Sequence, residues 1–254
     1  MEIQLVNPIP ELKYILCYPS FDEVVFRKRL AEAFMLGLRS IILEGNTEIK
    51  GFKVLGKGTT SIVVKGIYYD GKILTTKIRR TDSNRSSVIR EAKLLSLANE
   101  SGVGPRIVSF SRNFLLWEFI DGISLLDFIG LVNKNIRVVG KVLLDLIAQL
   151  YRLDLKGITH KELSKPKNHI LVTRGLKVFI IDFETASMIS GKSNLTQVMS
   201  FLFFDKNKAS YTLRNLLRIN AEDLRKLREM LKIYKHDRKA YGDIINFLRQ
   251  KIGT

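Results

Sequence analysis

The feature that most constrains the fold is a change of pattern at Asp121-Gly122. Before this point, runs such as "SIVVKGIYY" and "KILTTKI" are typical of strands, and Asp70-Gly71 between them is typical of a hairpin turn. After it, apolar residues recur at helical spacing, as in "VVGKVLLDLIAQLYRL". A run of strands followed by a run of helices indicates an α+β fold. The sequence therefore predicts a mostly β part up to about Phe119, a hinge at Asp121-Gly122, and a mostly helical part.

The remaining elements are predicted from the same patterns. In the β part we expect one strand at "EIKGFKVL", a glycine-rich turn at "LGKGTTS", a helix over about 87–99, and strands at "RIVSF" and "NFLLWEF". In the helical part we expect a short helix at "SLLDFIGLV" and strands at "HILVT" and "LKVFII" that join at Arg174-Gly175. Two helices close the chain, and Asn220 caps the first of them.

The N-terminal extension, residues 1–47, is expected to carry an additional helix. Ser20 and Glu23 have the spacing of a capping box. Apolar residues then recur at helical spacing. We therefore predict a helix from about Phe21 to Leu43 that packs against the rest of the chain rather than recruiting a partner.

The chain is strongly basic, with 42 Lys and Arg against 25 Asp and Glu and a formal net charge of +17. This balance favours polyanionic partners such as nucleic acid, ribosomes, acidic membranes or nucleotides, although a soluble basic protein has the same balance. Residues 206–254 hold 13 Lys and Arg and 5 Asp and Glu. This segment is the candidate surface for RNA or a ribonucleoprotein, and two solvated helical faces are the alternative.

The sequence favours a cytoplasmic location. Cys17 is the single cysteine, so an internal disulfide is excluded and a reducing compartment is expected. The N-terminus lacks the basic start and apolar run of a signal peptide. Charges interrupt every apolar run that might span a membrane, so no membrane span is expected. Nothing in the sequence indicates an oligomeric state.

Residues of the β part suggest contact with phosphate groups. Gly56, Gly58 and Ser61 lie in a turn between two strands, where glycines let backbone N–H groups approach phosphate oxygens. Most such turns bind nothing. Lys77, in the next strand, is either a solvated edge residue or a phosphate ligand. Glu91 follows 14 residues later in the next predicted helix and could orient the lysine as its counter-charge.

Two stretches of the helical part suggest a metal and a catalytic loop. Asp182 ends the apolar strand in "VFIIDFE", where its carboxylate could bind Mg²⁺ or cap a turn. The stretch "GITHKELSKPKNHI", which begins at Gly157, gathers a histidine, a glutamate, lysines and an asparagine between apolar runs. It is typical of a phosphoryl-transfer loop with a base and a metal ligand, or of a charged loop between a helix and a strand.

This order of parts resembles the protein-kinase-like superfamily from about Lys53 to Glu184. "HKELS" resembles the H-x-D-L-S loop of RIO kinases and "IDFE" is similar to their I-D-F element, while the small kinase of the KEOPS tRNA-modification complex is a related comparison. The resemblance implies a two-lobed α+β fold. It has an antiparallel-sheet N-lobe over 48–120, a reduced helical C-lobe over 121–254, and the extra N-terminal helix.

The resemblance implies that ATP binds partly through the N-lobe. Lys77 would contact phosphate oxygens and pair with Glu91. Glu118 and Phe119 would lie beside the adenine, where backbone groups make the hydrogen bonds. The residues that would line the triphosphate are Gly56, Lys57, Gly58 and Ser61.

The resemblance also implies catalytic roles in the C-lobe. Glu162 would take the position of the base, and Lys165 would help to neutralise the transferring phosphate. Asp182 would be the principal Mg²⁺ ligand and Asn168 the second. His160 would be a packing residue of the loop rather than a catalyst.

The sequence also departs from the family pattern. Glu162 replaces the family aspartate, and Asn168 follows it by six residues instead of five. Either the loop bulges and keeps both groups in place, or the base is lost; a shift of about 1 Å in a positioned group costs roughly a hundredfold in rate. Glu184 replaces the glycine after Asp-Phe, and Ser61 replaces the third glycine of the loop.

The resemblance implies an ATP- and Mg²⁺-dependent phosphotransferase, either an atypical serine/threonine protein kinase or a self-phosphorylating ATPase. Its substrate would be a protein or the chain itself. Two alternatives remain open: a small-molecule kinase, and a nucleotide-binding pseudokinase that docks on RNA or a ribonucleoprotein.

Overall fold

The computed structural model describes residues 1–6, 9–132, 135–189 and 191–253. The chain divides into two compact units. The first, called the sheet unit below, comprises Met1–Ser96 and Pro105–Phe119. The second, called the helical unit, comprises Leu97–Gly104 and Ile120–Thr254.

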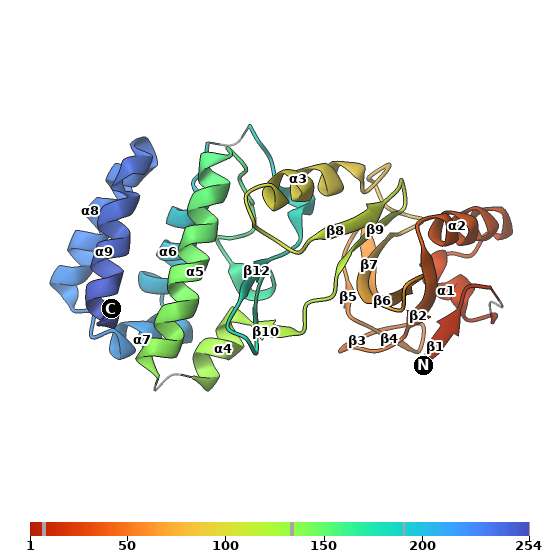
Figure 1. Cartoon of the computed structure of the whole chain (residues 1–254), viewed down its shortest axis with the longest axis horizontal. Coiled ribbons are helices and arrows are strands. Elements are labelled where there is room, and N and C mark those ends of the chain that lie inside the picture. Colours follow the sequence, from red (N-terminus) through yellow and green to blue (C-terminus); the bar gives the residue numbers. More distant parts are fainter. Residues whose placement is uncertain (7–8, 133–134, 190, 254) are drawn as a thin grey trace. The chain divides into compact units, whose positions relative to one another are not determined.

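The sheet unit is built on an antiparallel sheet, which among the described residues has seven strands in the order β1-β2-β6-β7-β9-β8, with β5 paired to β6 (Figure 1). β6 and β7 form the hairpin predicted at Asp70-Gly71, and Gly71 has the positive φ of 81° that such a turn needs. The predicted helix after β7 is α3 (Ile89–Asn99). The strands are β1 (Glu2–Gln4), β2 (Leu38–Ile42), β5 (Gly56–Lys57), β6 (Ser61–Tyr68), β7 (Ile73–Arg79), β8 (Ile107–Phe110) and β9 (Phe114–Glu118).

The N-terminal helix is shorter than predicted, and the expected span of Phe21 to Leu43 is wrong. Helix α2 covers Glu23–Met35, and β2 follows it and pairs with β1 and β6. Gly37 separates the two elements with a φ of 91°, and a Cβ there would meet the Tyr68 ring at 2.3 Å. Only glycine fits this position, so the chain leaves the helix here. The N-cap is Asp22, whose side chain accepts from the Val25 N–H, rather than Ser20.

The stretch "EIKGFKVL" forms two strands rather than the single strand predicted. β3 (Thr47–Ile49) and β4 (Phe52–Val54) pair as a small separate hairpin. Lys50 and Gly51 connect them and both have positive φ, 49° and 82°. Two consecutive positive φ values are those of a type I′ turn, which reverses the chain within two residues. The Lys-Gly pair was the missed signal.

The N-terminal extension packs against the sheet, as expected. Leu12 and Leu16 of α1 (Leu12–Leu16) are fully buried in one cluster with Ile62 and Ile78 of the sheet. These side chains belong to the same apolar core, so burial of α1 stabilises the sheet directly.

A buried polar network ties α2 to the β8–β9 turn. Arg29 is 2% exposed and donates to the Leu16 carbonyl and to Asn113 Oδ1. Glu32 accepts from the Asn113 backbone at 2.9 Å and from its side chain at 2.7 Å. Because buried charges need such partners, the network fixes how α2 sits on the sheet unit.

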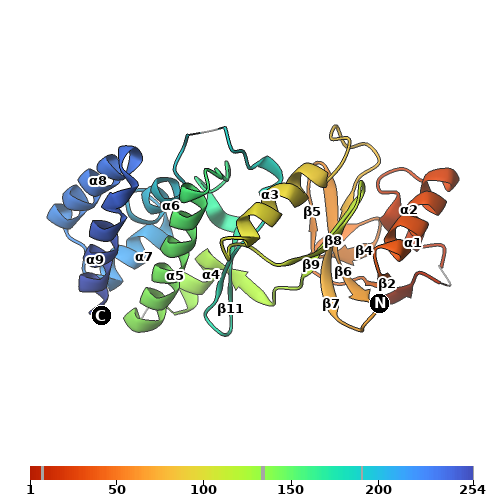
Figure 2. The same cartoon turned by 45° about the horizontal axis from the view of Figure 1, so that its top comes forward.

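The helical unit is arranged around α5 (Ile136–Leu155), which contacts α6 and α9, while α8 packs on α6 and α9 (Figures 1 and 2). The α5 face toward these helices is apolar and buried, as its helical spacing predicts. Asn220 caps α8 with Asp223 as a capping box. The other helices are α4 (Leu125–Leu131), α6 (Asn194–Phe203), α7 (Lys208–Leu216), α8 (Ala221–His236) and α9 (Tyr241–Ile252).

A small antiparallel sheet of β10 (Gly122–Ser124), β11 (Ile170–Thr173) and β12 (Val178–Ile180) completes the helical unit. The predicted hinge at Asp121-Gly122 is therefore wrong in part, because Gly122 begins a strand. A Cβ at Gly122 would meet the Val172 carbonyl at 2.9 Å, so glycine serves close strand pairing there rather than flexibility. Helices α6 and α7 were not predicted. No helix within the described ranges is long and apolar enough to cross a membrane.

Candidate active-site residues

The residues singled out in the sequence fall in both units. In the sheet unit, Lys77 of β7 forms a bidentate ion pair with Glu91, in the first turn of α3. Its Nζ lies 2.9 Å from Oε1 and 2.8 Å from Oε2. Both side chains are only 5% exposed. The pair expected from the spacing is present, and strand pairing to Val63 and Leu115 fixes the place of Lys77 on the sheet.

The glycine-rich turn joins β5 to β6. Gly58 N–H donates to the Ser61 carbonyl at 2.8 Å, which closes the turn. Neither Gly56 nor Gly58 has positive φ, and a Cβ would meet only Val63 at 4.0 Å or Ser61 O at 3.6 Å. These are ordinary van der Waals contacts, so the fold of the sheet unit does not require glycine at either position. A ligand that approaches the backbone closely would require it.

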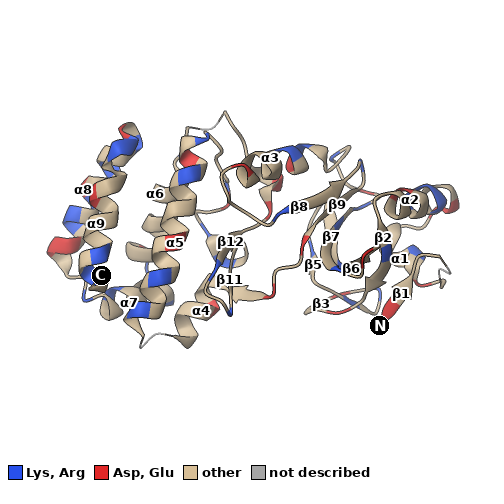
Figure 3. Ribbon diagram, in the orientation of Figure 1, with Lys and Arg blue, Asp and Glu red and all other residues tan. Residues whose placement is uncertain are grey.

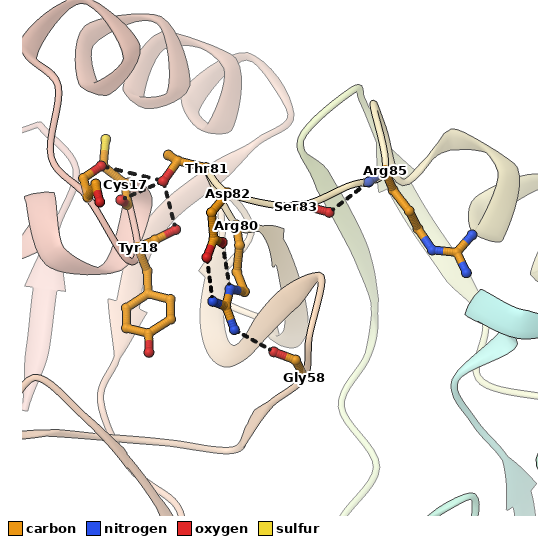
Figure 4. Close-up of polar contacts among 9 residues, drawn as sticks. Cys17, Tyr18, Gly58, Arg80, Thr81, Asp82, Ser83 and Arg85 are labelled. Atoms are coloured by element: carbon orange, nitrogen blue, oxygen red, sulfur yellow. Dashed lines mark hydrogen bonds and ion pairs between the residues drawn. The ribbon is translucent and has the colours of Figure 1, made fainter.

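Arg80 links the glycine-rich turn to the segment after β7. Its Nη1 donates to the Gly58 carbonyl at 3.0 Å, and its other nitrogens form two hydrogen bonds with Asp82 (Figure 4). The Arg80 guanidinium lies 5.1 Å from the centre of the Tyr18 ring, and Lys57 Nζ lies 5.4 Å from the same ring. Tyr18 of the N-terminal extension thus contacts Lys57 of the glycine-rich turn and Arg80, which holds that turn.

Thr81 attaches the same segment to the N-terminal extension. Its N–H donates to the Tyr18 carbonyl at 2.8 Å, and its hydroxyl lies 3.3 Å from the Cys17 carbonyl (Figure 4). Burial raises the pKa of the Cys17 thiol, which is 1% exposed. Sequence reasoning missed Tyr18, Arg80 and Thr81, because their contacts join segments that lie far apart in the chain.

Glu118 and Phe119, expected beside the adenine, lie at the end of β9. Glu118 Oε1 accepts from the Arg106 N–H at 2.8 Å, and the Glu118 N–H donates to the Arg106 carbonyl. The ammonium of Lys65 lies 4.1 Å from the centre of the Phe119 ring. The Glu118 side chain thus braces the β8–β9 pair, and its role toward adenine stays a prediction.

In the helical unit, the loop after α5 carries Glu162, Lys165 and Asn168. The Lys165 N–H donates to the Glu162 carbonyl at 3.1 Å, and a 3-10 turn follows over Pro166–Asn168. Lys165 and Asn168 are exposed, whereas Glu162 is half-buried. The loop between Glu162 and Asn168 is thus a compact turn, and the roles of the three side chains stay predictions.

Asp182 and Glu162 lie on either side of His169. Asp182 follows β12 with a φ of 65°, a left-handed conformation that costs energy for a residue other than glycine. Its Oδ2 lies 3.9 Å from His169 Nδ1, while Glu162 Oε2 lies 3.1 Å from His169 Nε2. Sequence reasoning missed His169. Its signal was a second histidine at the end of the same polar loop, directly after Asn168.

These three side chains suit a divalent cation. One donor atom from each of Glu162, His169 and Asp182 lies within 4.8 Å of the others. His169 Nδ1 is buried and has no hydrogen-bond partner among the described residues. Two carboxylates and an imidazole are common ligands of divalent metals. Asn168, the second metal ligand expected from the sequence, is the exposed residue beside this group.

His160 is a packing residue, as expected. Burial lowers the pKa of His160 to about 4, so its imidazole is neutral at pH 7. Its Nε2 lies 3.0 Å from the Ile181 carbonyl, and its ring meets Phe183 edge-on at 5.4 Å. The His160 N–H donates to Asn194 Oδ1 at 2.8 Å. His160 therefore fixes the loop against the segment that carries Asp182.

Asp154, near the end of α5, supports the loop that carries His160 through its hydrogen bond to Asn194. Its carboxylate accepts from the Asn194 side chain at 2.8 Å, from Ser193 at 2.7 Å and from the Tyr234 hydroxyl at 3.0 Å. Burial and the nearby carboxylate raise the pKa of Tyr234, so this phenol remains a donor. The network joins α5, α6 and α8 beneath His160.

Comparison with known proteins shows a relative of the chain, although no family model matches it. An uncharacterized protein of Methanocaldococcus jannaschii, MJ1211, is 34% identical over 118 residues, which are 46% of this chain and 97% of that protein. The chain belongs to the same family as this archaeal protein. That relative is about half as long as the chain and brings no function with it.

A solved structure of the autoinhibited serine kinase domain of the giant muscle protein titin has a similar fold. The alignment covers 78% of this chain and 79% of that domain, with a TM-score of 0.51 and 16% identity. This likeness shows a protein-kinase-like fold. The expected α+β class, with an antiparallel sheet in the N-terminal region and helices in the C-terminal region, is confirmed.

Proposed function

We propose that the chain is an ATP- and Mg²⁺-dependent phosphotransferase, namely an atypical serine/threonine protein kinase or self-phosphorylating ATPase similar to the RIO kinases. The observation that carries the proposal is the buried bidentate pair of Lys77 and Glu91 in a protein-kinase-like fold. Removing two charges from water costs several kcal/mol per ion, and apolar residues of the same volume are often as stable. Stability alone therefore does not account for the pair, and orienting the Lys77 ammonium toward phosphate oxygens is a role that this fold supports.

The glycine-rich turn adds independent support. Glycine at positions 56 and 58 is not needed for packing, so a ligand that must approach the backbone explains both residues. Arg80 holds the turn at the Gly58 carbonyl. In our proposal Gly56, Lys57, Gly58 and Ser61 line the triphosphate, and Glu118 and Phe119 flank the adenine.

In the helical unit, Asp182 holds Mg²⁺ and Glu162 orients the attacking hydroxyl, with Lys165 near the transferred phosphate. Bound Mg²⁺ supplies neutralisation of the charge on the transferred group. The left-handed backbone at Asp182 supports this role, because strained conformations concentrate at functional sites. The substrate is a protein or the chain itself, and the reaction takes place in the cytoplasm.

Two other functions remain alternatives. A small-molecule kinase would release ADP when it is supplied with the correct hydroxylated metabolite. A nucleotide-binding pseudokinase would instead dock on RNA or a ribonucleoprotein. Exposed Lys and Arg on α8 favour this second alternative, although Lys226 and Lys232 pair with Glu222 and Glu229 on the same helix (Figure 3). Binding to bulk tRNA that weakens steeply with salt would support it.

The test of the proposed function is transfer of a labelled γ-phosphate from Mg-ATP to a generic protein substrate or to the chain itself. Lys77→Met should abolish transfer. The matched control is Lys93→Met, which removes an exposed lysine of α3, and it should leave transfer intact. Equal transfer by the wild type and Lys77→Met would refute the assignment.

A further inference from the structure

We propose that His169 and Asp182 bind a divalent first-row transition-metal ion, with Glu162 as the outer carboxylate that orients the imidazole and His169 as the ligand that sets the choice of metal. The inference rests on the proposed function in placing the ion at Asp182, and it adds the second ligand and the class of ion that this position prefers. Metal binding itself requires neither ATP nor phosphoryl transfer, so it is tested separately.

Strand pairing brings the two ligands together. β11 and β12 are antiparallel with Ile170 opposite Ile180, and the Ile181 N–H extends the ladder to the His169 carbonyl at 2.9 Å. His169 and Asp182 therefore leave the ends of neighbouring strands at the same edge. The two ligands lie on a rigid element, which is what a preorganised metal site requires.

The loop supplies the carboxylate that orients the imidazole. His160, two residues before Glu162, anchors this loop by donating its backbone N–H to Asn194 Oδ1. Glu162 Oε2 then lies 3.1 Å from His169 Nε2, so it can accept from the Nε2–H and present Nδ1, on the other side of the ring, as the metal-binding nitrogen. Because Glu162 is one methylene longer than the family aspartate, it can reach the imidazole from this loop.

The imidazole has a nitrogen that no described residue satisfies. His169 Nδ1 is buried without a hydrogen-bond partner there, and Asp182 Oδ2 at 3.9 Å is too distant to accept from it. An unsatisfied buried polar atom is costly, so it points to a partner such as a metal ion. A protonated imidazole that bridges the two carboxylates is the competing arrangement, and the test separates the two.

The donor set indicates the class of ion. Mg²⁺ prefers oxygen ligands and gives up its waters reluctantly. An imidazole favours ions such as Mn²⁺, Fe²⁺ and Zn²⁺ over Mg²⁺, and a carboxylate beside it suits Mn²⁺ well. We therefore expect the site to bind Mn²⁺ more tightly than Mg²⁺, whereas an aspartate and asparagine pair would not make that distinction.

The test is titration of the full chain with Mn²⁺ in the absence of nucleotide, followed by electron paramagnetic resonance of unbound Mn²⁺. The wild type should bind one ion, and Mg²⁺ should compete poorly. His169→Gln keeps a hydrogen-bond donor toward Glu162 but removes the imidazole. Asp182→Asn keeps a residue that tolerates the left-handed backbone. Each variant should weaken Mn²⁺ binding by about tenfold or more.

Matched controls are His236→Gln and Glu229→Gln, which remove the same chemical groups from exposed positions of α8 and should leave Mn²⁺ binding unchanged. Circular dichroism verifies that each variant is folded, and Glu162→Gln serves as a further variant if another is not. Absence of saturable Mn²⁺ binding, or unchanged or tighter binding in His169→Gln, would overturn the inference and favour the protonated bridge. Mn²⁺ binding without phosphoryl transfer would leave the metal site standing and refute only the proposed function.

Discussion

Variants of Lys77 and Glu91 can distinguish the contribution of the ion pair to stability from its role in nucleotide binding. Replacing Glu91 with leucine leaves the Lys77 ammonium buried without this carboxylate. At 2.8 Å and an effective dielectric constant of about 20, the direct attraction is about 6 kcal/mol before desolvation is subtracted. Removing one member of such a buried pair costs about 3–5 kcal/mol. We therefore expect Glu91→Leu to lower the free energy of unfolding by that amount.

Replacing both residues should give a different result. The double variant Lys77→Met, Glu91→Leu removes both charges from the interior, so most of the lost stability should return. Nucleotide binding should not return, because no ammonium remains to contact phosphate. Urea unfolding of the wild type, both single variants and the double variant measures the coupling free energy, and a dye-labelled ATP analogue measures binding. If Glu91→Leu lowers the unfolding free energy by less than about 1 kcal/mol, the pair is solvated, and the role of burial in orienting Lys77 is refuted.

Three further predictions concern the turn and the buried thiol. Gly58→Ala should leave the unfolding free energy unchanged or raise it by about 0.5 kcal/mol, yet weaken ATP binding about tenfold. Gly71→Ala, at a φ of 81°, should instead lower the unfolding free energy and leave ATP binding unchanged. Arg80→Gln removes the support of Gly58 and should raise the KM for ATP more than it lowers kcat, whereas Arg225→Gln on α8 should change neither; equal effects of the two would contradict this. Cys17 should react with iodoacetamide far more slowly in the folded chain than in urea. Because burial raises the pKa of the Cys17 thiol in the folded chain, the unfolding free energy should fall, relative to Cys17→Ala, as the pH rises above about 9, the ordinary pKa of a thiol.

Much of the secondary structure follows from local patterns. The β6–β7 hairpin has an Asp-Gly turn, α5 has a long apolar stripe, and α8 has the Asn220 cap, and all three are observed. The errors arose where one glycine reverses a pattern. Gly37 ends α2 because the Tyr68 ring, 31 residues away, leaves no room for a side chain. A clash with a distant residue is absent from the local sequence.

The candidate site could be predicted only in part for the same reason. The Lys77–Glu91 pair joins neighbouring elements at a regular spacing, so sequence order was sufficient to find it. His169 becomes significant only when strand pairing sets it beside Asp182, and Arg80 only when the turn folds back onto it. Asn168 was predicted as a metal ligand from its residue type, whereas the adjacent His169 is the residue that lies beside Glu162 and Asp182.

Phosphotransferase activity through Asp182 is tested by measuring the transfer of labelled γ-phosphate from ATP by the wild type and by Asp182→Asn, in Mg²⁺ and in Mn²⁺. We expect transfer by the wild type and none by the variant, although the variant stays folded because asparagine tolerates the left-handed backbone at this position. Equal transfer by the two proteins would contradict the role of Asp182. No transfer by either, with ATP still bound, would contradict phosphotransferase activity and favour a pseudokinase.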